Sequence, residues 1–252
     1  MTPFPDFSLK GRTALVTGAG RGLGRAIAEV FAQAGAEVIL CARTGDEIES
    51  VATGLRDAGY RAKARPCDVT DLAAFRAVVD GLERLDVFVN NAGTNRPRRM
   101  TEVTEEDFDL IIGLNLRAAF FAMQAVTRRM TALGRGGSVI NMSSMLGHIG
   151  AEDRSVYCAS KWGIEGLTKA ASIELAPHRI RVNSICPTFI ETPLTKPYFE
   201  NPAFLDHALR MIKLGRLGQV EDITGAALYL ASEASALMTG SSIVLDGGWT
   251  AE

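Results

Sequence analysis

The stretch TALVTGAGRGLG, residues 13–24, decides the fold. Its opening residues, 13–16, form a short apolar run of the kind found in a buried strand. Glycines dominate the turn that follows, and residues 25–34 then read as a helix. A glycine turn permits positive φ angles and a close approach to the backbone, while the N-terminus of the next helix offers free N–H groups and a positive dipole end. This order of strand, turn and helix predicts a phosphate-binding site.

The turn itself has the pattern T-G-x-x-x-G-x-G rather than G-x-G-x-x-G, because Leu23 occupies the place of the third glycine. A tight turn without a ligand would also explain such a sequence. Its position directly between a strand and a helix favours a dinucleotide site instead. We therefore expect Gly18, Arg21, Gly22, Leu23 and Gly24 to contact a bound cofactor.

The rest of the chain alternates strand-like and helix-like segments. Strands separated by helix-sized segments imply right-handed βαβ units and a parallel sheet with helices on both faces. We expect a single-domain α/β fold over residues 1–252, a Rossmann-type doubly wound parallel sheet of about seven strands. For the segment 192–215 two interpretations remain open, a mobile lid over the substrate and a plain packed helix. Expected strands lie at 13–16, 37–41, 61–65, 86–89, 138–140, 181–185 and 241–245; expected helices lie at 25–34, 45–58, 72–82, 105–133 with a break near Gly113, 155–175 and 222–231.

Composition and charge exclude several classes of protein. Hydrophobic residues make up 47% of the 252 residues and charged residues 22%, which is ordinary for a soluble globular chain. Lys and Arg number 27 against 29 Asp and Glu, and a protein that neutralises many phosphates would be more basic. We therefore expect a small-molecule substrate and no nucleic-acid partner.

The cysteines and the N-terminus indicate a cytoplasmic protein. Cys41, Cys67, Cys158 and Cys186 are scattered, without a Cys-x-x-Cys pair or a Cys/His cluster, so neither a disulfide framework nor a metal site is expected. The N-terminal stretch MTPFPDFSLKG lacks the basic start and apolar run of a signal peptide. We see no apolar stretch that would span a bilayer, and expect no membrane partner.

Polar motifs follow several of the expected strands. In open parallel sheets ligands bind beyond the carboxyl ends of the strands. The glycine turn, the Asn-Asn-Ala-Gly stretch at 90–93, the serine pair at 143–144 and Pro187 all fall at such ends. We expect them to line one crevice.

The end of the second strand indicates which nicotinamide cofactor binds. An acidic residue there would hold the ribose hydroxyls of NAD(H), but this strand ends without a carboxylate. Arg43 can instead face a 2′-phosphate, together with Arg21, because guanidinium groups match phosphate geometry. Alternatively, Arg43 and Arg21 are solvated surface residues that bind no phosphate. NADP(H) is therefore favoured, with NAD(H) still open. Asp68, after the third strand, either accepts from the adenine amino group or caps a helix.

Tyr157 and Lys161 lie four residues apart, and therefore on one face of a helix. An ordinary tyrosine has a pKa of about 10, and a nearby ammonium group would lower it. The pair is then a proton donor and acceptor for a carbonyl/alcohol couple. Ser144 ends the preceding strand and can hold the substrate oxygen beside Tyr157, with Ser143 as the competing choice.

Together these motifs resemble the short-chain dehydrogenase/reductase family over nearly the whole chain. The resemblance implies that Tyr157 is the general acid/base and that Lys161 lowers its pKa and binds the nicotinamide ribose. It also implies that Ser144 rather than Ser143 orients the carbonyl and that Asn115 holds a water linked to Lys161. The residues that carry it are 17–24, Asp68, 90–93, Asn115, Ser144, Tyr157 and Lys161.

The same resemblance implies the remaining cofactor contacts and a homotetramer. One departure is Thr188, which follows Pro187 where the family commonly has glycine, and which adds bulk beside the nicotinamide carboxamide. Together with Arg43, which follows from the end of the second strand, the expected contacts beyond the glycine turn are Asp68, Val69, Asn91, Ala92, Gly93, Tyr157, Lys161, Pro187, Ile190 and Thr192.

Within the family, the chain looks most similar to bacterial dehydrogenases of sugar acids and polyols, such as gluconate 5-dehydrogenase. Arg96, Arg98 and Arg99 can draw an anionic substrate, although they can also balance nearby acidic residues. The stretch that should border the pocket contains His148, Glu152, Asp153 and Arg154, and its polarity suits a hydroxylated or charged substrate. We expect an NADP(H)-dependent oxidoreductase acting on a sugar, sugar acid or polyol. The alternatives are a 3-oxoacyl-thioester reductase and a non-catalytic NADP-binding sensor or scaffold.

Overall fold

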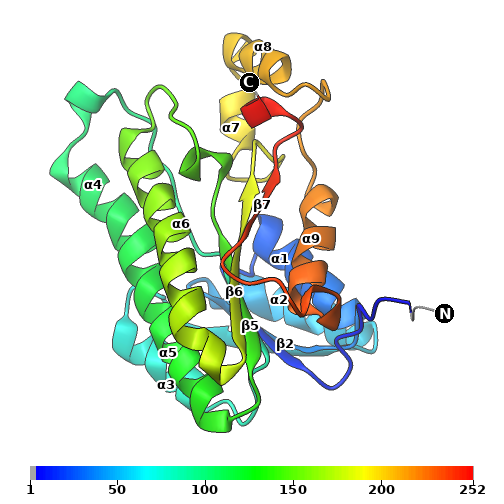
Figure 1. Cartoon of the computed structure of the whole chain (residues 1–252). Coiled ribbons are helices and arrows are strands. Elements are labelled where there is room, and N and C mark those ends of the chain that lie inside the picture. Colours follow the sequence, from blue (N-terminus) through cyan, green and yellow to red (C-terminus); the bar gives the residue numbers. More distant parts are fainter. Residues whose placement is uncertain (1–3, 252) are drawn as a thin grey trace.

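The computed structural model describes residues 4–251, so residues 1–3 and 252 of the expected domain lie outside the described residues. Seven parallel strands form one sheet in the order β3-β2-β1-β4-β5-β6-β7. The chain runs outward from β1 to β3 and then returns to place β4 on the other side of β1, where the topology switches. The expected doubly wound α/β fold is confirmed (Figure 1). The strands are β1 (Thr13–Thr17), β2 (Glu37–Ala42), β3 (Arg61–Pro66), β4 (Val87–Asn90), β5 (Gly137–Met142), β6 (Ile180–Pro187) and β7 (Ser242–Leu245).

Helices cover both faces of the sheet. α1, α2 and α9 pack on one face, and α3, α5 and α6 pack on the other (Figure 1). The helices are α1 (Gly22–Gln33), α2 (Gly45–Asp57), α3 (Leu72–Asp80), α4 (Glu105–Ile112), α5 (Ala119–Leu133), α6 (Ser155–Leu175), α7 (Lys196–Phe199), α8 (Pro202–Met211) and α9 (Glu221–Ala231).

The side chains of the central strands alternate between these two faces. In β1, Ala14 and Val16 join the core on the side of α1 and α9, whereas Leu15 joins the core on the side of α3 and α5. Phe88 of β4 lies with Leu15 in the second core. Since both faces are covered and all four side chains are fully buried, these strands are apolar runs without polar alternation.

α1 begins at Gly22 rather than at residue 25, so the end of the glycine turn is already the first turn of the helix. Its N-cap residue, Arg21, makes no side-chain capping bond. The first backbone N–H groups of α1 therefore remain available to a ligand at the switch point.

The expected break near Gly113 is a π-helical turn (Gly113–Ala118) inside one continuous helix, Glu105–Leu133. By length and composition this helix is apolar enough to cross a membrane, contrary to the expectation that no such stretch exists. However, 50% of its most apolar window is buried inside the protein. α5 packs on α3 and the sheet through Ala122 and Val126, so the helix belongs to the core of the fold.

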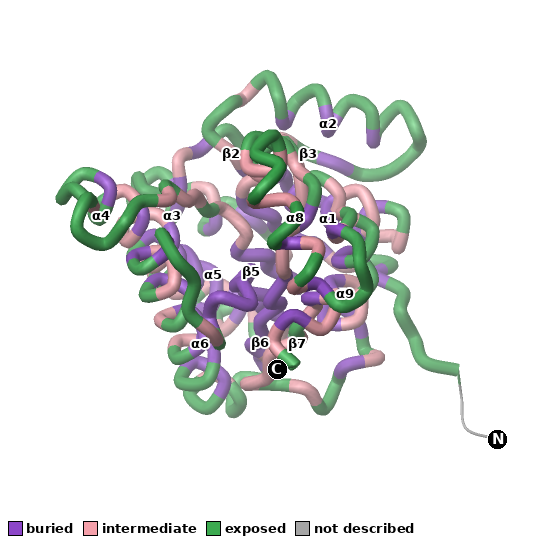
Figure 2. The backbone as a smooth tube through the Cα atoms, turned by 90° about the horizontal axis from the view of Figure 1, so that it is seen from above, coloured by how far each residue is buried: buried purple, intermediate pink, exposed green. Residues whose placement is uncertain are grey.

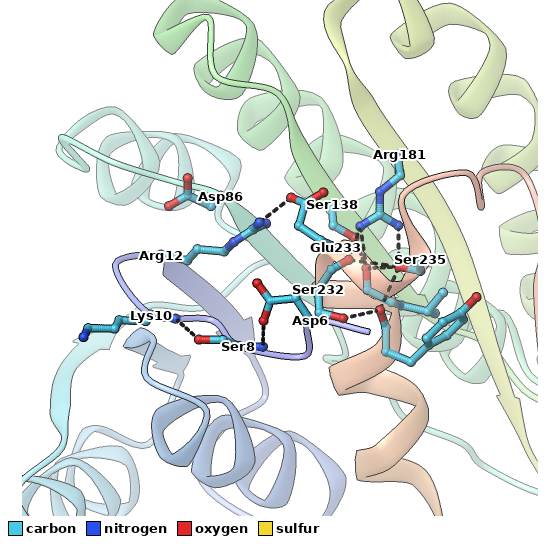
Figure 3. A network of polar contacts seen from close by, with 12 residues as sticks. Asp6, Ser8, Lys10, Arg12, Asp86, Ser138, Arg181, Ser232, Glu233 and Ser235 are labelled. Atoms are coloured by element: carbon cyan, nitrogen blue, oxygen red, sulfur yellow. Dashed lines mark hydrogen bonds and ion pairs between the residues drawn. The ribbon is translucent and has the colours of Figure 1, made fainter. Parts of the chain in front are cut away.

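A polar network fastens the N-terminal segment to the segment that follows α9 (Figure 3). Arg181 donates to the carbonyl oxygen of Leu230 at 2.8 Å and to Ser235 Oγ at 2.9 Å. Arg12 pairs with Glu233. Because Arg12 and Arg181 stand at the amino ends of β1 and β6, this network stabilises the fold at the edge opposite the glycine turn.

The segment 192–215 contains α7 and α8, which lie beyond the carboxyl ends of the strands (Figures 1 and 2). Its anchor is an aromatic cluster, in which the ring of Phe189 lies 5.1 Å from Phe204 and 5.5 Å from Trp249 between centroids. Tyr157 and Cys158 pack against the same cluster. The segment is therefore helical and packed over the end of the sheet where α6 begins.

Candidate active site

A cavity of about 520 Å³ opens at the switch point, between the glycine turn, the end of β4 and the loop after β6. Its volume lies in the range of ligand pockets. Of the cofactor residues expected from the sequence, it is lined by Gly18, Arg21, Gly22, Leu23, Arg43, Asp68, Val69, Asn91, Ala92, Gly93 and Thr192.

Gly24, unlike Gly18, Gly20 and Gly22, does not line the cavity. A Cβ on Gly24 would collide with the carbonyl oxygen of Gly18. Gly18 itself has a φ of +64°, in the left-handed region that favours glycine. Gly24 therefore allows α1 to pack closely on the turn, and Gly18 shapes the turn that faces the ligand.

Hydrogen bonds join the glycine turn to the end of β4 across the switch point. The backbone N–H groups of Asn91 and Ala92 donate to Thr17 Oγ1 at 3.0 and 3.1 Å. Asn91 Nδ2 donates to the carbonyl oxygen of Thr17 at 2.8 Å. Asn90 is buried and donates to Asn141 Oδ1 at 3.1 Å, so it supports the sheet rather than facing the cavity.

The loop after β6 closes the cavity from the other side. Thr192 faces the glycine turn, since a Cβ on Gly22 would lie 3.5 Å from Thr192 Cβ. Pro187 ends β6, and Ile190 is buried and forms a β-bridge with Gly218. Neither Pro187 nor Ile190 lines the described cavity, so their expected cofactor contacts remain predictions.

Thr188, the departure from the family pattern, keeps ordinary backbone geometry. Its φ is not positive, and its N–H donates to the carbonyl oxygen of Leu245 at 3.1 Å. Its Oγ1 atom is buried and has no hydrogen-bond partner within residues 4–251. A buried hydroxyl without a partner is unusual, and a carboxamide beside it would supply that partner. This hydroxyl and the glycine-lined cavity fit a nicotinamide dinucleotide.

Arg43 and Asp68 stand together at the rim of the cavity. The Arg43 side chain is 75% exposed, and its Nη1 atom lies 4.0 Å from Asp68 Oδ2. Asp68 Oδ1 accepts from the backbone N–H of Thr70 at 2.9 Å and from its hydroxyl at 2.7 Å. Asp68 thus shapes the turn after β3, while the helix cap nearby is Asp71. Its adenine contact remains a prediction.

Sequence reasoning missed one wall of the cavity, formed by the long central helix. Asp109, Gly113 and Arg117 recur every four residues and all line the cavity. That spacing was the available signal, because such residues share a helix face. Glu47 of α2 brings a carboxylate to the opposite side, with Oε2 at 2.7 Å from the position of a Cβ on Gly20. No sequence pattern indicates Glu47.

The end of β5 and one face of α6 bring the expected catalytic residues together. Lys161 Nζ donates to the carbonyl oxygen of Met142 at 2.8 Å and lies 5.5 Å from the centroid of the Tyr157 ring. The Ser144 hydroxyl lies close enough to the Tyr157 phenol to act on its pKa. The hydroxyl of Ser144, the phenol of Tyr157 and the ammonium group of Lys161 thus lie close together.

The structure also separates the two candidate serines. Ser144 lies beside Tyr157, and its Oγ atom accepts from the N–H of Leu146 at 3.2 Å. The hydroxyl of Ser143 faces Cys186 instead. Ser144 is therefore the serine that can share a substrate oxygen with the phenol.

Burial raises the pKa of Tyr157 to about 12, although the hydrogen bond with Ser144 and the charge of Arg154 act in the opposite direction. The expectation that Lys161 lowers this pKa remains a prediction. The Lys161 ammonium lies over the ring and donates to a carbonyl oxygen, not to the phenol. The Tyr157 phenol is consequently protonated and neutral at physiological pH.

A buried polar cluster lies behind Lys161. Burial lowers the pKa of Lys161 to about 8, while Cys186 and Glu165 act to raise it. Glu165, one turn further along α6, accepts from Ser184 Oγ at 3.0 Å. His148 Nε2 lies 3.3 Å from Cys186 Sγ and 3.5 Å from Glu165 Oε2. Sequence spacing gave no sign of this cluster, because its members come from separate elements.

Asn115 is buried on the π-helical turn and joins two elements of the site. Its Nδ2 atom donates to the carbonyl oxygen of Thr94 at 2.8 Å and to Ser160 Oγ at 3.3 Å, and its Oδ1 atom accepts from the Thr94 N–H at 2.8 Å. Asn115 therefore fastens the loop after β4 to α6, near Tyr157. Its expected water-binding role remains a prediction.

Comparisons with known proteins agree with this geometry. A sequence family described as enoyl-(acyl carrier protein) reductase matches residues 18–250. L-xylulose reductase from Bos taurus is 36% identical over 254 residues, covering 98% of this chain and 99% of the relative. Gluconate 5-dehydrogenase from Gluconobacter oxydans (strain 621H) is 36% identical over 251 residues, covering 98% of each. A 3-oxoacyl-[acyl-carrier-protein] reductase from Thermotoga maritima is 38% identical over 244 residues, covering 95% and 98%.

Solved structures extend the agreement to the whole backbone. A gluconate 5-dehydrogenase from Burkholderia cenocepacia, crystallised with NADP and tartrate, has a TM-score of 0.95 at 34% identity and covers 98% of both chains. The sheet order, the glycine turn and the Ser–Tyr–Lys set are those of a Rossmann-type dehydrogenase or reductase. The chain belongs to the short-chain dehydrogenase/reductase family.

Proposed function

We propose that this protein is an NADP(H)-dependent oxidoreductase that interconverts a secondary alcohol and a ketone in a sugar, a sugar acid or a polyol. The observation that carries the proposal is the meeting of Ser144, Tyr157 and Lys161 at the end of the sheet where the glycine-lined cavity opens. The similarity to L-xylulose reductase and gluconate 5-dehydrogenase supports the class of substrate.

The cofactor would lie along the cavity, from its exposed rim to the end of β6. Gly18, Gly22 and the free N–H groups of α1 would hold its phosphates. Arg43 would face the 2′-phosphate, and the Thr188 hydroxyl would bond to the carboxamide. When bound, the nicotinamide supplies or accepts the hydride.

Tyr157 performs the proton transfer. During reduction its phenol donates a proton to the ketone oxygen, while the Ser144 hydroxyl donates a hydrogen bond to the same oxygen and polarises the carbonyl. Lys161 carries the positive charge that stabilises the phenolate as it forms. In the oxidative direction the phenolate takes the proton back from the alcohol.

Glu165→Gln is expected to shift the alkaline limb of the pH profile to lower pH. Lys161 has a pKa of about 8 and Glu165 acts to raise it, so loss of the carboxylate makes Lys161 release its proton earlier. The measurement is kcat/KM for reduction against pH, which reports groups of the free enzyme. Glu174→Gln, on an exposed part of the same helix, is the control. An unmoved or upward-shifted limb contradicts the role given to Glu165.

Arg43→Ala is expected to weaken NADPH binding by roughly tenfold or more, because charge-assisted hydrogen bonds to a phosphate are lost. NADH, which lacks the 2′-phosphate, should bind almost as well as before. Fluorescence titration with both cofactors measures the difference. Arg25→Ala removes an exposed arginine that pairs with Glu29 and serves as the control. Equal weakening of both cofactors would remove the argument for NADP(H).

The substrate class is tested by NADPH oxidation with a keto-sugar acid and acetoacetyl-CoA side by side. We expect preference for the keto acid. Preference for the thioester would favour a 3-oxoacyl-thioester reductase, a reading supported by the similarity to the Thermotoga maritima enzyme. A sensor or scaffold that only binds NADP would turn over neither compound, and the complete Ser–Tyr–Lys set disfavours it.

We further propose a homotetramer that works in the cytoplasm. Exposed apolar side chains on the helices of one face, Phe108, Phe120, Trp162 and Ile173, give such an assembly a surface to bury. The four cysteines are free thiols, which suits a reducing compartment. Light scattering of the purified protein tests the assembly against the mass of a single chain, 27.0 kDa.

A further inference from the structure

We propose that Arg154 forms a binding subsite for a substrate carboxylate, so that the enzyme selects keto acids over neutral ketoses of the same length. The inference rests on the proposed function, because it concerns the substrate that Tyr157 and Ser144 reduce. It follows from the different surroundings of the four arginines that the sequence places near the pocket.

Three of these arginines are unsuited to the role. Arg96 Nη1 lies 3.0 Å from Asp107 Oδ1, and Arg98 Nε lies 2.6 Å from Asp107 Oδ2. Arg96 also pairs with Glu106 at 3.2 Å. Arg99 is exposed on the loop. Two of the charges are thus neutralised within the protein, and the third lies in water, where it is screened.

Arg154 differs from the others in both burial and partners. It is only 8% exposed, and its hydrogen bond within the described structure runs from Nη1 to the neighbouring Asp153 carbonyl oxygen at 3.2 Å. Within residues 4–251, no carboxylate forms an ion pair with it. A buried guanidinium with most of its five N–H donors unused is costly, and an anionic ligand would remove that cost.

Arg154 lies close to the expected reacting centre. It immediately precedes α6, three residues before Tyr157, and its charge acts directly on that phenol. Its guanidinium carbon lies 5.4 Å from the centroid of the Tyr198 ring on α7. This cation–π contact helps to hold the guanidinium group in place, and its remaining N–H donors can make a two-point contact with a carboxylate.

The backbone before Arg154 adds an independent sign of a constrained site. Asp153 has a φ of +59°, in the left-handed region that residues other than glycine rarely adopt. Such conformations persist where surrounding structure fixes them, and they cluster at ligand sites. Together, the turn at Asp153 and the ring of Tyr198 hold Arg154 beside Tyr157 from two elements.

This placement defines the chemical class of the substrate. Its ketone oxygen must reach Tyr157 and Ser144 while a carboxylate of the same molecule reaches Arg154. A short hydroxylated keto acid meets both requirements. A neutral ketose or an acyl thioester places no carboxylate at Arg154 and leaves the buried charge without a partner.

The test compares two substrates in one variant. In Arg154→Gln, we expect the ratio of kcat/KM for a keto-gluconate to kcat/KM for a neutral ketohexose to fall roughly ten- to hundredfold, the range of a charge-assisted contact. Arg154→Lys should recover only part of that ratio, because an ammonium cannot make the two-point contact. Arg98→Gln, which removes a charge already paired with Asp107, should leave the ratio as it was.

An unchanged ratio in Arg154→Gln, or an equal loss with both substrates, would overturn the proposal. If Arg154→Gln does not fold, inhibition of the unaltered enzyme tests the proposal instead. Gluconate should then inhibit ketohexose reduction more strongly than neutral glucitol, and equal inhibition would overturn the proposal. If the proposed function itself is wrong, the result differs from a failure of the Arg154 subsite: the unaltered enzyme would reduce acetoacetyl-CoA and neither sugar derivative.

Discussion

Tyr157→Phe should lower kcat for ketone reduction by about a thousandfold or more, while NADPH still binds. General acid catalysis contributes typically 10²–10⁴-fold, and this substitution removes the proton that reaches the substrate oxygen. The Ser144 hydroxyl remains, but a serine cannot replace a phenol as an acid. Because the ring stays, the packing of Tyr157 against the aromatic cluster is retained.

The measurement pairs steady-state turnover with a fluorescence titration of NADPH on the same preparation. Tyr229→Phe is the matched control, since it removes a phenol from α9, on the other face of the sheet. Substantial turnover in Tyr157→Phe, with normal cofactor binding, would contradict the mechanism. Loss of NADPH binding as well would show that the substitution disturbs the cavity and not the proton transfer alone.

The features that could be predicted from the sequence are those encoded locally. The apolar run of β1 and the glycines that follow it fix a strand, a turn and a helix within a dozen residues. Each βαβ crossover has one favoured hand, so the order of segments restricts the topology to a doubly wound sheet. The same logic places the ends of β1, β4, β5 and β6 at one edge, where the cavity and the candidate catalytic residues lie.

Contacts between distant segments could not be predicted. The sequence places Arg96, Arg98, Arg99 and Arg154 near the pocket, and only the fold reveals that Asp107 forms ion pairs with Arg96 and Arg98. The pKa of Tyr157 is a second example, because it depends on burial by the aromatic cluster around Phe189 and Trp249, whose rings come from separate loops.

The sequence also could not decide where a helix breaks or how a substitution changes the conformation of a loop. The π-helical turn at Gly113 continues the helix where a break was expected, and it places Asn115 in contact with Thr94 and Ser160. Thr188 in place of glycine suggested a changed loop, yet the backbone there has an ordinary conformation. Local propensity cannot decide such positions, because tertiary contacts select among conformations of similar energy.

Lys161→Met should lower kcat/KM for reduction by about a hundredfold or more, within the range of a lost acid–base partner. Lys161 is buried, donates to Met142 and is the cation nearest the face of the Tyr157 ring. Methionine has a similar length and no charge, so the developing phenolate loses its electrostatic support. Lys169→Met, two turns further along α6 and exposed, controls for a change to the helix.

The pH profile distinguishes this role from simple packing. Burial lowers the pKa of Lys161 from 10.5 to about 8, so the ammonium is present below that pH and lost above it. In the unaltered enzyme kcat/KM for reduction should therefore fall as the pH rises through about 8, while Tyr157, with a pKa of about 12, stays protonated. Lys161→Met should lack this limb, since methionine has no proton to lose. A limb near pH 8 that persists in the variant would assign the titration to another group and contradict the role of Lys161.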